Sequence, residues 1–271
     1  MLRAILVSTV LLFALPAHAV EVEKMRELLR IMGFDVAMEA IGPSFSGAKE
    51  GIGGRTPEFD DVWDRTALEV FPPGEIFEAH ARAIAPKFSD AEWLTLVAYF
   101  NEGLGAKVTQ MENKAHRPDG EAEKARIGDD LLAQTADENP ERLAQIDTLI
   151  RVLSTEEESL AYAMNISYAM AMGLASTGQL PAELTEQQIL EMLQAQAPEM
   201  REDMRNSAIR SNVYTYRDLS NEELQQYIDF LSADPAKKLY EALHAESAVL
   251  IPALVQRLGR TVMEKMGTSK L

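Results

Sequence analysis

The sequence predicts an all-α protein, a helical bundle built from two tandem, multi-helix halves that we interpret as a duplication. Apolar residues recur at the spacing of amphipathic helices almost throughout, and no alternating pattern of convincing length indicates a strand. The same helix start is also written twice, at residues 88–93 and 219–224. The chain has 271 residues, 46% of them hydrophobic, and no Cys, so burial of a core must supply its stability.

The N-terminal segment, from Met1 to Ala19, has the form of a secretory signal peptide. Arg3 precedes an apolar run from Ala4 to Leu15, and Ala17-His18-Ala19 supplies the small residues that a signal peptidase requires. The alternative is an uncleaved anchor, but this run is shorter than the roughly 20 residues that span a bilayer as a helix. We therefore expect cleavage after Ala19 and a periplasmic or secreted bacterial protein without a transmembrane anchor after processing.

The rest of the chain divides into three parts. We expect a first helical repeat at residues 20–115, a charged and partly helical connector at 116–145, and a second repeat at 146–271. Residues 28–32 resemble residues 149–153 at an offset of 121, whereas the two helix starts match at an offset of 131. Two matched segments in the same order favour duplication, with a 10-residue insertion in the second copy.

Both matched helix starts are capping boxes. Ser89 precedes Glu92 by three residues, and Ser220 precedes Glu223 in the same way, so hydroxyl and carboxylate can each satisfy a free backbone N–H group. Apolar residues before and after each cap have the spacing of a hydrophobic staple. The helices then present matching apolar stripes: Trp93, Leu96, Val97 and Phe100 in the first copy, and Leu224, Tyr227, Ile228 and Leu231 in the second.

The match continues through the turn after each of these helices, because the nine residues from Tyr99 align with the nine from Phe230. The first copy has two glycines in its turn. In the second copy Asp234 can cap a helix whose first residue is Pro235. Both segments are therefore expected to be tight connections between helices.

Capping residues and prolines predict the other helix boundaries. Helices are expected to start at Thr56-Pro57, at Ser154 with Glu157, and at Thr185 with Gln188. Pro72-Pro73 should end one helix and start the next, Pro198 should separate two helices, and Pro252 should interrupt or kink the last one.

The connector is polar and charged, and we expect it to lie against a core. Pro118-Asp119-Gly120 is typical of a turn, a short helix is expected at residues 122–132, and Asn139-Pro140 predicts a new helix start. Four apolar residues at intervals along this segment favour docking over a freely flexible linker: Leu131, Leu132, Leu143 and Ile146.

The charge balance limits the partners that the protein can have. The net charge is −17, and removal of the leader takes away Arg3 and no acidic residue, which leaves −18. Such a charge repels nucleic acid and anionic membrane surfaces. It keeps an exported protein soluble, and it also favours a basic partner.

The leader, the Ser-x-x-Glu helix start and the following segment Phe230-Leu231-Ser232-Ala233-Asp234-Pro235-Ala236-Lys237-Lys238 resemble the domain of unknown function 2059 family. Residues 210–258 carry the likeness best. The family pattern usually has Gly where Ala236 stands, and the Ala233-Asp234 pair lengthens the turn. The resemblance implies an exported bacterial all-helical domain, and it implies no catalytic residue because the family has no assigned activity.

Histidines offer little chemistry in this sequence. His18 leaves with the leader, His116 lies in a polar turn, and His244 lies next to an apolar stripe. His80 is four residues from both Ile76 and Ile84 on an inward-facing stripe, where we expect a structural residue, because no Ser, Cys or metal-ligand spacing accompanies it. The sequence therefore assigns no catalytic residue, no cofactor-binding residue and no metal ligand.

Acidic runs and a glycine cluster have structural explanations. The acidic runs Asp60-Asp61-Asp64, Asp129-Asp130 and Glu156-Glu157-Glu158 lack the spacing of a calcium loop, and we interpret them as helix first turns and solvated faces. Gly51-Ile52-Gly53-Gly54 lacks the Lys-Ser/Thr of a phosphate loop and is interpreted as a turn.

Three functional hypotheses follow. The first is a non-enzymatic exported protein of unknown role that acts through protein or envelope contacts. The second is a carrier or chaperone-like module with an apolar groove between the repeats, in which Met164, Met170 and Met172 adapt to a ligand beside Trp63 or Trp93. The third is a hydrolase that uses His80 with a nearby acid. The first is preferred because the sequence contains no catalytic motif.

Overall fold

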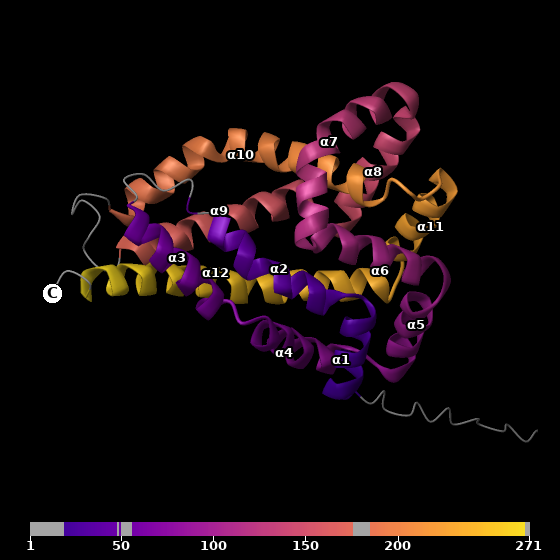
Figure 1. The fold of residues 1–271 in the computed structure, drawn as a ribbon. Helices are drawn as coiled ribbons and strands as arrows, with labels where there is room; N and C mark the ends of the chain where they lie inside the picture. Colours follow the sequence, from indigo (N-terminus) through magenta and orange to yellow (C-terminus); the bar gives the residue numbers. More distant parts are fainter. Residues whose placement is uncertain (1–18, 48, 50–55, 176–184, 269–271) are drawn as a thin grey trace, which may run out of the picture.

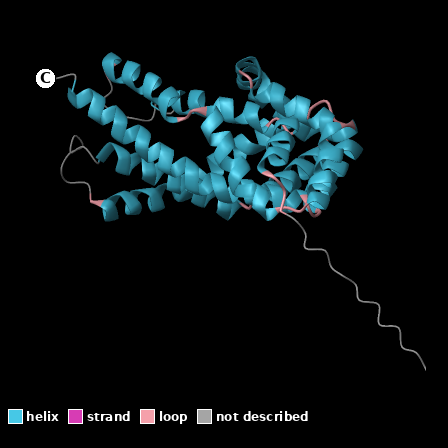
Figure 2. Cartoon of the chain, turned by 90° about the horizontal axis from the view of Figure 1, so that it is seen from below, coloured by secondary structure: helices cyan, strands magenta, loops and turns pink. Residues whose placement is uncertain are grey.

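The structure, a computed structural model, describes residues 19–47, 49, 56–175 and 185–268. Within these residues the chain folds into helices joined by short connections, without a strand (Figures 1 and 2). The extended backbone makes one antiparallel bridge, between Ala19 and Ser89. The prediction of an all-α protein is confirmed.

The helices follow one another closely along the chain. In order they are α1 (Val22–Ile31), α2 (Phe34–Gly47), α3 (Pro57–Val70), α4 (Pro73–Ile84), the 3₁₀ helix η2 (Ala85–Lys87), α5 (Asp90–Asn101), α6 (Gly103–His116), α7 (Pro118–Glu138), α8 (Pro140–Leu153), α9 (Glu156–Ala175), α10 (Glu186–Thr215), α11 (Asn221–Ser232) and α12 (Ala236–Thr268). No helix in the described ranges is long and apolar enough to cross a membrane.

The last helix, α12, organises the molecule by packing against α9, α3 and α4 (Figure 1). Helices α9 and α12 run in the same direction and approach closely, because Gly173 meets Gly259 at their contact. Helix α10 returns antiparallel along α9, and an ion pair of 3.0 Å between Arg201 and Glu156 joins the two. Since neither glycine has a side chain, the α9 and α12 backbones can touch.

Two clusters of buried apolar side chains hold the helices together. The larger one joins residues of α1 to α5 to residues of α9 and α12. The smaller one gathers residues of α6, α8, α10 and α11. Tyr99, Phe230 and Tyr240 pack against both clusters, so the two cores are continuous at this point.

The predicted capping boxes at α5, α11 and α10 are confirmed. Each has both reciprocal hydrogen bonds: Ser89 with Glu92, Ser220 with Glu223, and Thr185 with Gln188. Before α9 the prediction of Ser154 with Glu157 is wrong by one residue. Thr155 and Glu158 form the reciprocal bonds there, and Thr155 directly precedes the first helical residue.

Helix boundaries predicted from prolines and from polar composition are wrong at several other positions. Pro118 is the first residue of α7, which extends to residue 138, so the connector contains a long helix in place of a turn and a short helix. Pro198 does not separate two helices, because α10 runs through it. Pro235 lies just before α12 and is not its first residue. Helix α12 is not interrupted at Pro252.

The matched segments fold into similar elements. Helices α5 and α11 are each 12 residues long and start from the same kind of cap. The duplication of the two halves nevertheless remains a prediction. Apart from Ala19, the predicted leader lies outside the described residues, as does the cluster Gly51-Ile52-Gly53-Gly54.

Candidate binding pocket

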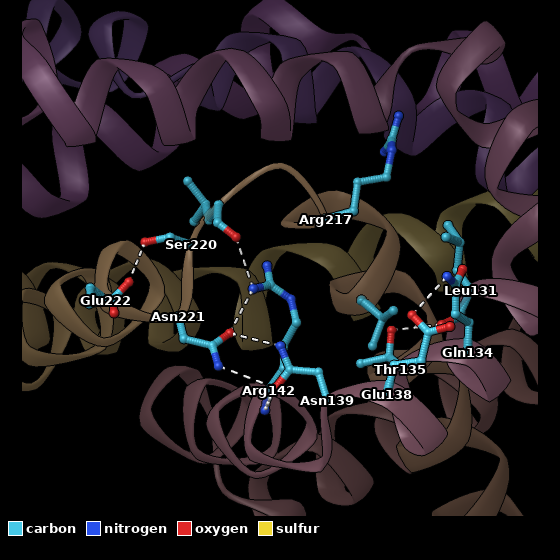
Figure 3. A pocket seen from close by; sticks show the side chains of 12 residues that line it. Leu131, Gln134, Thr135, Glu138, Asn139, Arg142, Arg217, Ser220, Asn221 and Glu222 are labelled. Carbon is cyan, nitrogen blue, oxygen red and sulfur yellow. Dashed lines mark hydrogen bonds between the residues drawn. The ribbon is translucent and has the colours of Figure 1, made fainter.

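A polar pocket lies where α7, α8, α10 and α11 meet (Figure 3), and its volume is about 550 Å³. It is lined by Leu131, Gln134, Thr135, Glu138, Asn139, Arg142, Val213, Arg217, Leu219, Ser220, Asn221 and Glu222. Most of these side chains are polar or charged, so the pocket suits a ligand that forms hydrogen bonds or ion pairs.

Two helix starts position this pocket. The Asn139 side chain accepts a hydrogen bond from the Arg142 backbone N–H at the start of α8, and Ser220 caps α11. The amides of Asn139 and Asn221 bond each other at 3.2 Å and hold the two starts side by side. The pocket is therefore built from local capping signals at two places distant in the sequence.

Arg142 lies at the floor of the pocket and is only 7% exposed. Its guanidinium donates to the backbone oxygen of Leu219 at 2.9 Å and to Asn221 Oδ1 at 3.1 Å (Figure 3). It also donates to the backbone oxygen of Tyr216. Burial lowers the pKa of Arg142, and the negative charge of Asp218 opposes this shift. Within the described chain no carboxylate lies within ion-pair distance of this guanidinium.

Hydrogen bonds to carbonyl groups do not neutralise a cation. A guanidinium has five N–H donors, and the contacts with Leu219, Asn221 and Tyr216 use three of them. A buried charge usually has a partner of opposite sign because its desolvation is costly. The Arg142 floor can therefore receive a carboxylate or a similar anionic group.

The rim of the pocket carries both signs of charge. Arg217 lies over the Tyr214 ring at 4.1 Å, and it bonds Glu123 at 3.4 Å. Glu138 accepts a hydrogen bond from Gln134, while Glu222 accepts one from Ser220. The acidic rim residues would favour a cationic group on the same ligand that brings an anion to the floor.

Sequence reasoning did not single out Arg142. One signal was present: Arg142 shares a helical stripe with Ile146 and Leu149, both of which are fully buried. A lone Arg on an otherwise apolar face indicates a buried cation. Its carbonyl partners, on Tyr216 and Leu219, come from a segment far away in the sequence and have no local signature.

A second hollow, of about 590 Å³, lies along α1 and reaches the end of α5. Its lining is mostly charged: Glu21, Glu23, Lys24, Glu27, Arg30, Ile31 and Asn101. Lys24 is paired there with Asp90 at 2.7 Å, on the exposed surface. This hollow contains no buried, uncompensated charge that would select a ligand.

His80 is fully buried, as its helical stripe predicts. Its Nδ1–H donates to the backbone oxygen of Ile76 at 2.8 Å, and its Nε2 accepts a hydrogen bond from the Ser247 hydroxyl at 2.9 Å. Burial lowers the pKa of His80, so the neutral ring is favoured. A backbone carbonyl, and not an acid, orients the ring, and this arrangement satisfies a core histidine.

The residues suggested for an apolar groove lie in different surroundings. Trp63 is fully buried, with its indole N–H bonded to the backbone oxygen of Phe45 at 2.8 Å, and Trp93 bonds the backbone oxygen of Lys24 at 2.8 Å. Three methionines on α9 are partly buried: Met164, Met170 and Met172. Neither described hollow is lined by any of these five residues.

The acidic runs take structural positions. Asp64 accepts hydrogen bonds from Lys49 and Ser46, and the bond from Lys49 lowers its pKa most. Glu158 caps α9 with Thr155. His116 is the exposed last residue of α6, while His244 is exposed on α12. No group of three potential metal ligands comes together in the ranges that the structure describes.

A half-buried acid among tyrosines, Glu112, was also missed by sequence reasoning. Glu112 Oε1 accepts hydrogen bonds from the hydroxyls of Tyr216 at 2.6 Å and Tyr227 at 2.9 Å. Burial raises the pKa of Glu112, and the tyrosine bonds oppose this shift. Burial also raises the pKa of Tyr99 to about 12, and its hydroxyl has no hydrogen-bond partner in the described structure.

Comparisons with protein-family models, curated proteins and solved structures gave no match to this chain.

Proposed function

We propose that this chain is an exported, non-enzymatic helical protein that acts through contacts with another protein of the cell envelope and holds an anionic group of that partner in the Arg142 pocket. The observation that carries the proposal is the buried guanidinium at the pocket floor, which backbone and amide oxygens hold without a carboxylate within ion-pair distance in the described chain, Asp218 acting only from farther away. A carboxylate from a partner would supply that charge.

The chemistry of the partner follows from the rim and from the whole chain. Glu138 and Glu222 line the same pocket as Arg142, and the net charge of the protein is −17. A protein segment that carries basic side chains next to a free carboxylate would match the Arg142 cation, the acidic rim and the negative net charge. Long-range attraction to the acidic protein would steer such a segment, and Arg142 would select its carboxylate.

Export is part of this proposal. Val20, the first residue after the predicted cleavage point, is 4% exposed, and its backbone N–H donates to the Phe88 oxygen at 2.9 Å. The support for cleavage after Ala19 is the form of the N-terminal sequence, with Arg3, an apolar run and then Ala17-His18-Ala19. The resemblance to the domain of unknown function 2059 family and the duplication of the helical unit belong to the same proposal.

The geometry favours binding over the two alternatives. A hydrolase would need an accessible base, whereas His80 is fully buried and both its ring nitrogens are bonded. A carrier of apolar ligands would need an apolar hollow, whereas both described hollows are lined mainly by polar and charged residues.

Labelled peptides test the proposal directly. The mature protein is mixed with a peptide mixture rich in Lys and Arg, either with free C-terminal carboxylates or with C-terminal amides. We expect it to retain the carboxylate peptides, with amidation weakening binding by about tenfold or more because a charged hydrogen-bonded contact is lost. Equal retention of both forms would contradict the proposed role of Arg142.

A blocking variant separates the pocket from the rest of the surface. Gln134 is exposed and lines the pocket, so Gln134→Trp should fill the hollow without entering a core and should abolish retention. Gln194→Trp makes the same change at an exposed position of α10 outside the pocket, and should retain the peptides. Turnover of ester, peptide or glycoside substrates that a single substitution abolishes would overturn the non-enzymatic assignment.

A further inference from the structure

Two ion pairs join the halves of the molecule in a reciprocal way. Lys107 Nζ contacts both carboxylate oxygens of Glu223 at 2.8 Å, and Lys238 Nζ contacts Glu92 Oε1 at 2.6 Å. Lys107 and Lys238 match at the sequence offset of 131, as do Glu92 and Glu223. The lysine of each half therefore reaches the glutamate that the other half carries at the matching position.

Each of the two glutamates also has two roles, as a helix cap and as the partner of a lysine. Glu92 Oε2 accepts from the Ser89 backbone N–H at 2.8 Å and so completes the capping box of α5. Glu223 Oε2 accepts in the same way from Ser220 at 2.9 Å at the start of α11. Each carboxylate thus closes its own helix start while it receives the lysine of the opposite half.

A stacked aromatic pair lies between these ion pairs. Tyr99 and Phe230 have ring centroids 3.4 Å apart and planes that differ by 7°. They too match at the offset of 131, so each meets its own counterpart. In a twofold arrangement, a residue that contacts its own equivalent lies on the axis, and pairs away from the axis occur twice with exchanged partners. The stack and the ion pairs have these two properties.

The helices behind this contact are docked alike in both halves. Helix α1 packs on α4 and α5, and helix α8 packs on α10 and α11. Lys24 of α1 bonds the Asp90 side chain at 2.7 Å, and Gln145 of α8 bonds the Asn221 backbone oxygen at 3.0 Å. Lys24 and Gln145 match at the offset of 121, and Asp90 and Asn221 at 131. These are the offsets of the two repeated sequence segments.

We infer that α5 with the start of α6, and α11 with the start of α12, are two copies of one self-complementary docking surface, which meet around an approximate twofold axis at the Tyr99–Phe230 stack. The partner of each surface is the other copy, as in a symmetric dimer whose subunits have been joined in one chain. This contact between the halves is independent of the Arg142 pocket. Ion pairs that are partly open to solvent contribute little energy, so here they fix the register of a contact that the aromatic rings stabilise.

Distances between spin labels test the symmetry in the full-length chain, which has no Cys of its own. One doubly labelled variant carries Thr95→Cys with Ala233→Cys, and the other carries Gln226→Cys with Glu102→Cys; all four positions are exposed. A twofold axis exchanges these pairs, so we expect equal distances. Equal distances within each half, from 95 to 102 and from 226 to 233, combined with unequal distances across the halves, would overturn the inference.

Charge reversal tests whether both contacts stabilise the fold. Lys107→Glu and Lys238→Glu each place two carboxylates together, so the urea midpoint should fall in both and the losses should add in the double variant. The loss should be larger for Lys238→Glu, because Lys238 also lies over the Phe88 ring at 4.7 Å. Lys87→Glu, at an exposed position, is the control for the change in net charge. If one reversal lowers the midpoint and the other behaves like Lys87→Glu, the two contacts are not equivalent and the inference fails.

Discussion

Three buried or half-buried polar side chains of the described chain are held by neutral hydrogen-bonding groups. His80 bonds a carbonyl and a hydroxyl, Arg142 bonds two carbonyls and an amide, and Glu112 accepts from two tyrosines. In each case the partners satisfy hydrogen bonds of the group but do not neutralise its charge. Their ionisation should therefore influence stability.

Glu112 provides a test at this scale. Its folded-state pKa is raised above the ordinary value of 4.5, so the stability of the native chain should fall as the pH rises from 4.5 through the raised pKa. Glu112→Gln keeps an oxygen acceptor for the tyrosines and does not ionise. As the pH rises above 4.5, we expect the variant to gain stability relative to the native chain, measured by urea unfolding. Glu102→Gln, at an exposed position, is the control, and a difference independent of pH would contradict the role of Glu112.

For single side chains, sequence patterns predicted burial but not hydrogen-bond partners. The stripe with Ile76 and Ile84 placed His80 in the core. Ser247, which bonds it, is 167 residues away, and no local pattern links the two positions. The Arg142 pocket was missed for the same reason, since its carbonyl partners become available only after α8 and α10 have packed.

Among the helices, capping residues predicted the start correctly where the sequence allows only one capping box. Before α9 the sequence Ser154-Thr155-Glu156-Glu157-Glu158 allows two overlapping boxes, and the later one forms. Pro198 was taken as a break, but it is exposed on α10, so its ring lies toward solvent and the helix continues past it. The polar connector became α7 because packing on α6, α8 and α10 compensates for its composition.

The contact between α9 and α12 depends on two glycines. A Cβ atom on Gly173 would lie 2.4 Å from the Gln256 backbone oxygen, so Gly173→Ala must push the helices apart. We expect a loss of about 2 kcal/mol, in the range of overpacked cores. A Cβ on Gly74 would meet nothing within 4 Å, so Gly74→Ala in the first turn of α4 should gain up to about 1 kcal/mol. Chemical denaturation measures both, and an unchanged Gly173→Ala variant would show that the close approach is not required.

At the scale of the whole molecule, the two cores should unfold together. Tyr99, Phe230 and Tyr240 pack against both cores and link them. Both Trp residues of the chain, Trp63 and Trp93, belong to the larger core or pack against it. We therefore expect the unfolding midpoint from Trp fluorescence, which reports on the larger core, to coincide with the midpoint from far-UV circular dichroism, which reports on all helices.

A variant with a weakened junction between the two cores tests this expectation. Tyr99→Ala with Phe230→Ala removes the stacked pair at the junction, and the two midpoints should then separate. Leu94→Ala, at a position 59% exposed, should leave them together. Separate midpoints in the native chain would mean that the halves fold as two domains.

The position of α12 also determines the order in which the chain can fold. The larger core contains side chains of α1 to α5 together with Leu239, Val255, Leu258 and Val262 of the last helix. Contacts between the two ends of a sequence form late, because a long stretch of chain must first be ordered. Helices α1 to α5 leave the ribosome before α12, so their core can close only after α12 has been made. A chain truncated before α12 would therefore lose the packing of α1 to α5 as well.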